Sequence, residues 1–123
     1  MFRLRGAGAW SGGGLVKITT GTLSLAGGIL ADGGTTVYAG AGSGGGILIN
    51  AGAVSGTGTI SARGGSATAN TNYGAGGGGR IAVYYTTNTL SIDNILASGG
   101  KSGDGSIASR NGGNGTVRFS LLP

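Results

Sequence analysis

The chain has no cysteine, no histidine and no glutamate. Without cysteine it forms no disulfide and no thiolate metal site. Without histidine a serine nucleophile lacks its usual general base. The acidic residues Asp32, Asp93 and Asp104 stand far apart, each in a turn-like context beside glycine or asparagine. The sequence therefore predicts no enzyme, no metal site and no cofactor.

Charge is also scarce. Eight Lys and Arg residues against three Asp give a net charge of +5. Only Arg3 and Arg5 lie close together, whereas nucleic-acid-binding proteins gather their cations on one surface. The pattern indicates isolated solubilising charges, which also discourage unwanted pairing at strand edges. We expect no nucleic-acid partner.

Long hydrophobic runs are missing as well. No stretch reaches the ~18 apolar residues that a membrane span needs, so none is predicted. The basic start of the chain is followed by Gly and Ala rather than by the apolar region of a signal peptide. Two alternatives follow: either the protein stays inside the cell, or its export signal has been removed or lies outside this sequence.

Glycine is abundant, with 32 of 123 residues, and such compositions are often disordered. An apolar fraction of 38% with only 9% charged residues opposes disorder. Apolar pairs also recur in two series. The first series is Val16/Ile18, Ile47/Ile49, Ile81/Val83 and Val117/Phe119, and the second is Ile29/Ala31, Ile60/Ala62 and Ile95/Ala97. The first and second pairs are 13, 13 and 14 residues apart, and a period in the low thirties is typical of a stacked repeat array.

Residues two apart share one face of a strand, so each pair predicts a short strand with an inward face. We expect first strands at 16–20, 47–51, 81–85 and 116–121, and second strands at 28–31, 59–62 and 94–97. The fold class is therefore all-β, a parallel β-solenoid with units 14–45, 46–78 and 79–114 and a final strand at 115–122. The core columns are expected to be Ile29, Ala31, Ile47, Ile49, Ile60, Ala62, Ile81, Val83, Ile95 and Ala97.

Glycine-rich returns join the units and vary in length while the strand spacing does not. They are either flexible surface loops or extended, polyglycine-II-like segments that pack side by side, as only glycine allows. We favour ordered packing. Leu23, Val54 and Leu90 are expected to fill a corner column, with a bulge or longer turn before Leu90.

The strings GGGILINAGAVSGTGTISARGG (44–65) and GAGGGGRIAVYYTT (74–87) carry a resemblance. They resemble the Gly-rich repeat regions of large bacterial surface and secreted proteins, and they are similar to the coils of parallel β-helix adhesins. The resemblance implies a scaffolding or adhesive role outside the cell or at its surface. It implies no reaction chemistry.

The last predicted strand has no second strand after it, and an unpaired apolar strand templates pairing with another chain. We therefore expect a structural subunit of an extracellular filament in which copies join head to tail by strand complementation. The partner is the protein itself. The expected self-assembly interface consists of Leu15, Val16, Ile18, Val117, Phe119, Leu121 and Leu122.

Two other functions remain open. The protein could be a glycan-binding adhesin or phage tail-fibre module that recognises surface glycans through its loops. Tyr84 and Tyr85 beside Arg80, together with Trp10, Tyr38 and Tyr73, could stack on sugars or bases. It could also bind ice through Thr20-x-Thr22 and Thr57-x-Thr59. Matches to GxGxxG are expected by chance in so glycine-rich a chain and do not indicate a nucleotide site.

Overall fold

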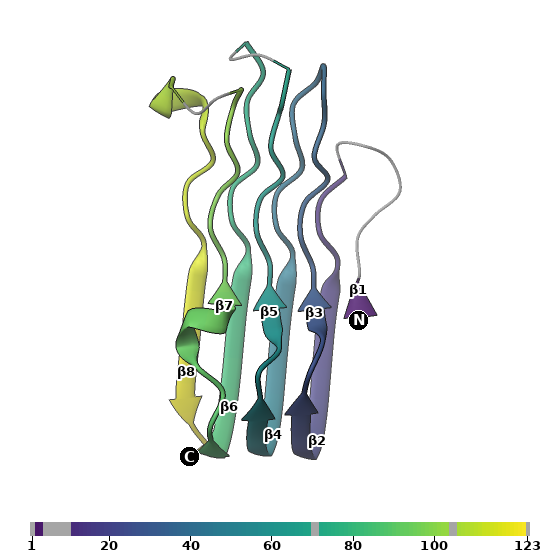
Figure 1. Cartoon of the computed structure of the whole chain (residues 1–123), viewed down its shortest axis with the longest axis vertical. Coiled ribbons are helices and arrows are strands. Elements are labelled where there is room, and N and C mark those ends of the chain that lie inside the picture. The colour runs from purple at the N-terminus through teal and green to yellow at the C-terminus, as the bar shows by residue number, and fades with distance from the viewer. Residues whose placement is uncertain (1, 4–10, 70–71, 104–105, 123) are drawn as a thin grey trace.

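The computed structural model describes residues 2–3, 11–69, 72–103 and 106–122. They form a β-solenoid of about three turns, in which each coil contributes one strand to each of two parallel sheets (Figure 1). Two short 3₁₀ helices, η1 (Ile92–Asn94) and η2 (Ala108–Arg110), interrupt the coils. The first sheet contains β2 (Leu15–Leu25), β4 (Gly46–Gly56), β6 (Arg80–Asn88) and β8 (Thr116–Leu121), and the second contains β1 (Phe2–Arg3), β3 (Gly28–Leu30), β5 (Thr59–Ser61) and β7 (Ile95–Leu96). The predicted fold class is confirmed.

The register of both sheets follows the repeat of apolar pairs. In the first sheet Val16 pairs with Ile47, Ile47 with Ile81, and Ile81 with Val117. In the second sheet Ile29 pairs with Ile60, and Ile60 with Ile95. Equivalent side chains of successive coils therefore lie on top of one another, because parallel strands in register bring like residues together.

The first strands are longer than the sequence predicted. β2 and β4 each span 11 residues rather than the five expected, and β6 spans nine. The apolar pattern predicts ends at Thr20 and Ala51, one residue before Gly21 and Gly52. Pairing instead continues on the far side of both glycines, from Thr22 opposite Ala53 onwards.

The core is a column of aliphatic side chains between the two sheets. Its centre is completely enclosed, with Ile49, Ile60 and Val83 at 0% exposure. The ten residues expected in the core columns are all buried, and Val16, Leu25, Ala51, Val54 and Leu90 pack with them. Because each side chain contacts the coil above and the coil below, burial depends on stacking rather than on a compact globule.

The corner column departs from the expected alignment in the third coil. Leu23 pairs with Val54, but Val54 pairs with Asn88 rather than with Leu90. The Asn88 side chain accepts a hydrogen bond from the Leu90 N–H at 2.9 Å and donates one to the Leu90 carbonyl at 3.0 Å. This local turn absorbs the two extra residues, and Leu90 is still buried at the core.

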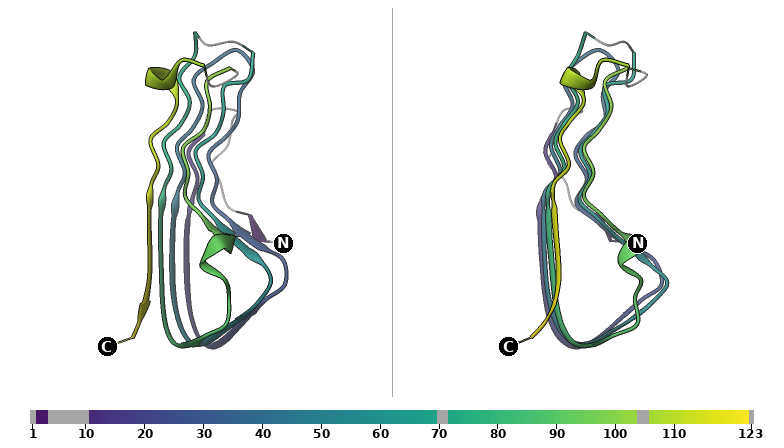
Figure 2. Two further views of the ribbon diagram at one scale, coloured as in Figure 1. Left: turned by 60° about the vertical axis from the view of Figure 1, so that its left-hand side comes forward. Right: turned by 90° about the vertical axis from the view of Figure 1, so that its left-hand side faces the viewer.

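About half of each coil lies outside the β-strands. Beyond the second strand the chain runs out along an outgoing arm (31–36, 62–67 and 97–102) and comes back along a return arm (11–14, 41–45, 75–79 and 111–115). Viewed along the stack, the coils share one outline, which is wide around the strands and narrow across the arms (Figure 2).

The arms pack through their backbones. A β-carbon built on Gly76 would overlap the carbonyl oxygen of Gly42 in the coil below, and one built on Gly65 would overlap that of Gly34. Any other residue would push these backbones apart, so the glycines are required by close approach. The expected side-by-side packing of the glycine-rich segments is present.

Hydrogen bonds connect the arms across the stack as well as along it. The N–H of Gly76 donates to the carbonyl of Gly65 in the same coil at 3.0 Å, and Gly65 donates to Gly42 in the coil below at 2.8 Å. The same alternation continues through the other coils, so one zigzag chain of bonds runs through Gly112, Gly100, Gly76, Gly65, Gly42, Gly34 and Ser11. Each inner residue of this chain donates through its N–H and accepts at its carbonyl, so both polar groups of its backbone are satisfied.

No helix in the described part of the chain is long and apolar enough to cross a membrane.

Candidate assembly surface

The two ends of the stack expose strand edges. In the first sheet the outermost strands are β2 and β8, and in the second they are β1 and β7. The predicted interface residues lie on β2 at one end, and on β8 and the residue after it at the other (Figure 1). A single copy therefore does not bring the two groups together.

At the β2 end, apolar side chains face an open hollow. Leu15 is 69% exposed, whereas Val16 and Ile18 turn toward the core. Each end of the column has a hollow, and the hollow at the β2 end measures ≈ 460 Å³. It is lined by Leu15, Val16, Lys17, Ile18 and Ile29.

At the β8 end, three of the predicted interface residues are well exposed. Val117 is 39% exposed, Leu121 64% and Leu122 37%. The inward-facing Val117 borders a hollow of ≈ 290 Å³ together with Ile95, Leu96, Ala97, Ser98, Asn114 and Gly115. Both ends of the aliphatic column are therefore open and apolar.

Phe119 is the best anchored of the predicted interface residues on β8. Its ring lies 4.8 Å from that of Tyr85 on the neighbouring strand, at an angle of 55°. Both rings pack against the core. Such a tilted aromatic pair adds about 0.5–1.5 kcal/mol beyond its buried area, which fixes β8 onto β6.

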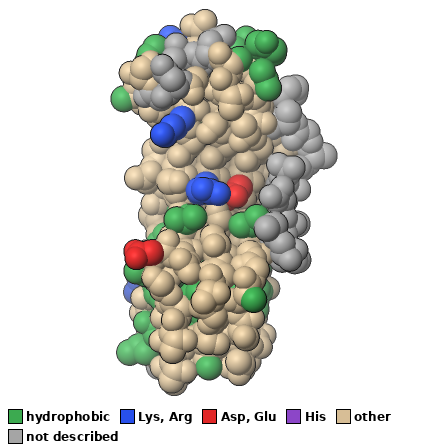
Figure 3. Space-filling model, in the orientation of Figure 1, with side chains coloured by type: hydrophobic (Ala, Val, Ile, Leu, Met, Phe, Trp, Pro, Cys, Tyr) green, Lys and Arg blue, Asp and Glu red, His purple; other side chains and the backbone are tan. Residues whose placement is uncertain are grey.

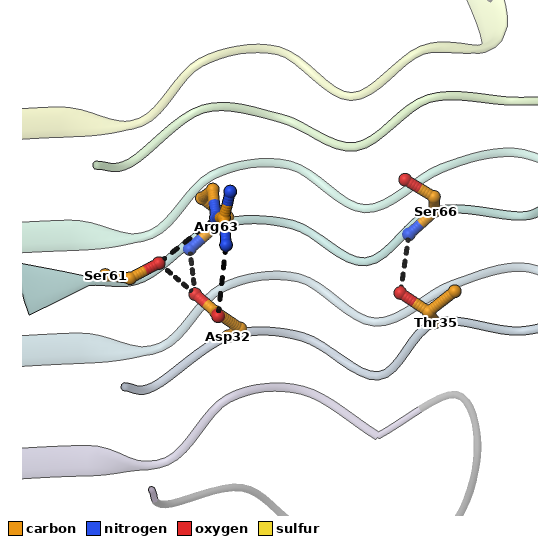
Figure 4. Close-up of polar contacts among 5 residues, drawn as sticks. All are labelled: Asp32, Thr35, Ser61, Arg63 and Ser66. Atoms are coloured by element: carbon orange, nitrogen blue, oxygen red, sulfur yellow. Dashed lines mark hydrogen bonds and ion pairs between the residues drawn. The ribbon is translucent and has the colours of Figure 1, made fainter. Parts of the chain in front are cut away.

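A polar groove of ≈ 290 Å³ runs over the outgoing arms. Asp32 is one of its lining residues, and its Oδ1 accepts hydrogen bonds from the Ser61 hydroxyl at 2.5 Å and from the Arg63 N–H at 2.7 Å (Figure 4). The guanidinium of Arg63 is 4.0 Å from the other carboxylate oxygen. Further along, the Ser66 N–H donates to the Thr35 hydroxyl at 3.2 Å. These contacts all join one coil to the next.

The expectation that the aspartates sit in turns is wrong for Asp32. It lies in an extended outgoing arm, where its carboxylate satisfies groups of the next coil. The sequence held a signal for this role, because Asp32 and Arg63 are separated by 31 residues, one repeat. Asp93 does lie in a tight turn, in η1, where its N–H donates to the Ser91 hydroxyl. Asp104 lies outside the described residues.

The residues of the two other functions are dispersed. Thr20 and Thr22 belong to β2 and pair with Ala51 and Ala53, whereas Thr59 belongs to β5 in the other sheet, so the threonines do not form a ladder. Tyr85 packs inward, and Tyr38 is 74% exposed. Trp10 lies outside the described residues.

Charged groups are spread thinly over this molecule. The face seen in Figure 3 has few charged side chains: near its middle a basic side chain lies beside an acidic one, and the others are scattered over uncharged surface. Within the ranges that the structure describes, no three His, Cys, Asp or Glu residues gather as a metal site would require. Every buried side-chain nitrogen and oxygen in those ranges has a hydrogen-bond partner. No family model, curated protein sequence or solved structure matches this chain.

Proposed function

We propose that the protein is a structural subunit that joins copies of itself head to tail into an extracellular filament. The observation that carries the proposal is that, among the residues that the structure describes, the stack ends at both ends in parallel strand edges without a partner strand, over an open apolar column. Such edges are templates for further pairing. Apolar surface left in water at both ends adds a driving force for covering them.

The two ends are complementary in topology. One end presents β1 and β2, and the other presents β7 and β8, so both sheets can continue at once into a second copy. β8 belongs to the first sheet and β1 to the second. The β8 of one copy and the β1 of the next would then be the two strands of a single coil.

This junction joins unlike surfaces, since the β8 end of one copy meets the β2 end of the next. A head-to-tail contact of this kind leaves a free end after every addition and produces a filament unless the rotation closes a ring. In the stack, successive coils are displaced along one direction (Figure 1), which favours an open rod.

The rest of the molecule suits a mechanical role. Its coils are joined by strand pairing in one half and by backbone hydrogen bonds in the other, so the stack is tied along its whole width. The resemblance to Gly-rich repeats of bacterial surface and secreted proteins supports a place outside the cell or at its surface.

Negative-stain imaging of the purified chain tests the proposal, with a variant that lacks residues 116–123. We expect rods of constant width from the full chain and none from the truncated one. Fibres that are unchanged by the truncation, or a full-length chain that stays monomeric at every concentration, would overturn the proposal.

A pair of point variants guards against misfolding of the truncated chain. Val117→Asp places a charge on the inward face of β8, where the next copy would bury it at a large cost. Ser120→Asp introduces the same charge on the outward face of that strand. We expect Val117→Asp to abolish the rods while the monomer keeps its β circular dichroism, and Ser120→Asp to leave them.

A further inference from the structure

The first sheet carries cations and no acid. Its four strands contain Lys17, Arg80 and Arg118 and not a single Asp or Glu. All three project from the outer face, because the alternate residues Val16, Ile81 and Val117 turn inward. Arg80 and Arg118 border a shallow hollow on that face, which Leu15, Leu48 and Ala82 also line.

The register inside the stack is constant along this face. Lys17 pairs with Leu48, Leu48 with Ala82, and Ala82 with Arg118. One row of outward side chains therefore begins with a cation on β2 and ends with a cation on β8. Within one copy the two lie at opposite ends of the sheet.

Resting on the proposed function, we propose that copies join in this same register, which sets Arg118 directly beside the next copy's Lys17. Val117 then lies beside Val16 of the next copy, and Phe119 lies beside Ile18 of the next copy. The apolar column therefore continues across the junction. A shift of one residue would turn the apolar side chains outward. A shift of two residues keeps them inward but sets Arg118 beside Leu15 or Thr19 and separates the cations.

Like charges directly opposite each other on paired strands are unfavourable. In the first sheet the junction is thus held by backbone pairing and apolar burial and is opposed by the pair of Arg118 with the next copy's Lys17. Both cations lie on the outer face, where salt screens them, with a Debye length of about 10 Å at 0.1 M. Assembly of the unmodified protein should therefore strengthen as sodium chloride is raised from low to physiological ionic strength.

Charge reversal gives a sharper test by sedimentation velocity at low ionic strength. Lys17→Glu and Arg118→Glu each convert the repulsive pair into an attractive one. We expect each to lower the concentration of half-assembly by about five-fold and to make added salt weaken assembly. The double variant faces Glu with Glu, so it should assemble poorly alone. Mixed with the unmodified protein it should co-assemble, because both kinds of junction then pair opposite charges.

Arg63→Glu is the matched control, since it makes the same change in net charge on the outgoing arm of the second coil, which is hydrogen-bonded to a coil on each side and lies at neither end of the stack. If it promotes assembly as strongly as the two single variants, general charge reduction explains the effect and the register is overturned. If rods form but the single Glu variants do not promote assembly and the double variant does not impair it, the proposed register is overturned while the proposed filament stands. Monomers in every variant and at every salt concentration overturn the filament itself.

Discussion

The strand half and the arm half of each coil are held together by different means. In the strand half, aliphatic side chains such as Ile49 and Ile60 fill the space between the sheets. In the arm half no side chain lies between the layers at Gly42, Gly65 or Gly76, and backbone contacts backbone. The strand half is stabilised by buried side chains, whereas the arm half packs closely because its glycines have no side chain.

This difference predicts opposite responses to the same small side chain. Alanine removes atoms in the strand half and leaves a cavity, whereas in the arm half it adds a methyl group where there is no room. The free energy of unfolding of single-alanine variants, measured with urea on the monomer, therefore compares the two halves directly.

The largest loss is expected in the strand half. Ile60→Ala empties the centre of a column that Ile29 and Ile95 border on either side. Truncation of an enclosed isoleucine costs about 2–5 kcal/mol, and the upper part of that range applies where the neighbours cannot collapse. Ile92→Ala, at a side chain 57% exposed, should cost less than about 0.5 kcal/mol. Equal urea midpoints for the Ile60→Ala and Ile92→Ala variants would contradict the stacked column.

A loss nearly as large is expected in the arm half. Gly76→Ala forces a methyl group against the carbonyl of Gly42, and overpacking of this kind costs about 1–3 kcal/mol, with the upper part of that range expected where the backbone must move. The adjacent Gly77 is the matched control, since its β-carbon would meet only the Gly113 carbonyl, at 3.7 Å. Gly77→Ala should be neutral or slightly stabilising, because alanine restricts the unfolded chain. Similar losses at both positions would mean that the arms are not packed in this way.

The smallest effect concerns the polar groove where the two halves meet. Asp32→Ala removes the acceptor of the Ser61 hydroxyl and of the Arg63 N–H, for a loss of about 1–2 kcal/mol. Arg63→Ala keeps the N–H and loses mainly an ion pair that is half exposed, so it should cost well under 1 kcal/mol. If Arg63→Ala lowered the free energy of unfolding more than Asp32→Ala, the ion pair rather than the hydrogen bonds would join these coils.

The sequence predicted the strand half better than the arm half. The pairs Ile29/Ala31 and Ile60/Ala62 recur at a fixed offset, and register follows from that offset alone. The extension of β2 beyond Gly21 was missed because a local glycine penalty is outweighed by pairing with a neighbouring coil. In the arms the zigzag of hydrogen bonds depends on which backbones meet across the coil, and glycine leaves no side-chain pattern from which to read that.

The open ends were also partly predictable. The apolar pattern of Val117 and Phe119 indicated an inward face on the last strand, and the structure places it on an outermost strand of the first sheet. The pairing of Asp32 with Arg63 is not indicated by either segment alone, because the two residues belong to successive repeats. Only comparison at the repeat offset brings them together.

Amide hydrogen exchange tests most directly the central claim, that the arms are as firmly built as the strands. We expect the N–H groups of Gly65, Gly76 and Gly100, each a donor within the zigzag, to exchange as slowly as those at the centre of β4. Exchange of these glycines at the rate of unprotected peptides, while β4 stays protected, would contradict the account and make the arms ordinary loops.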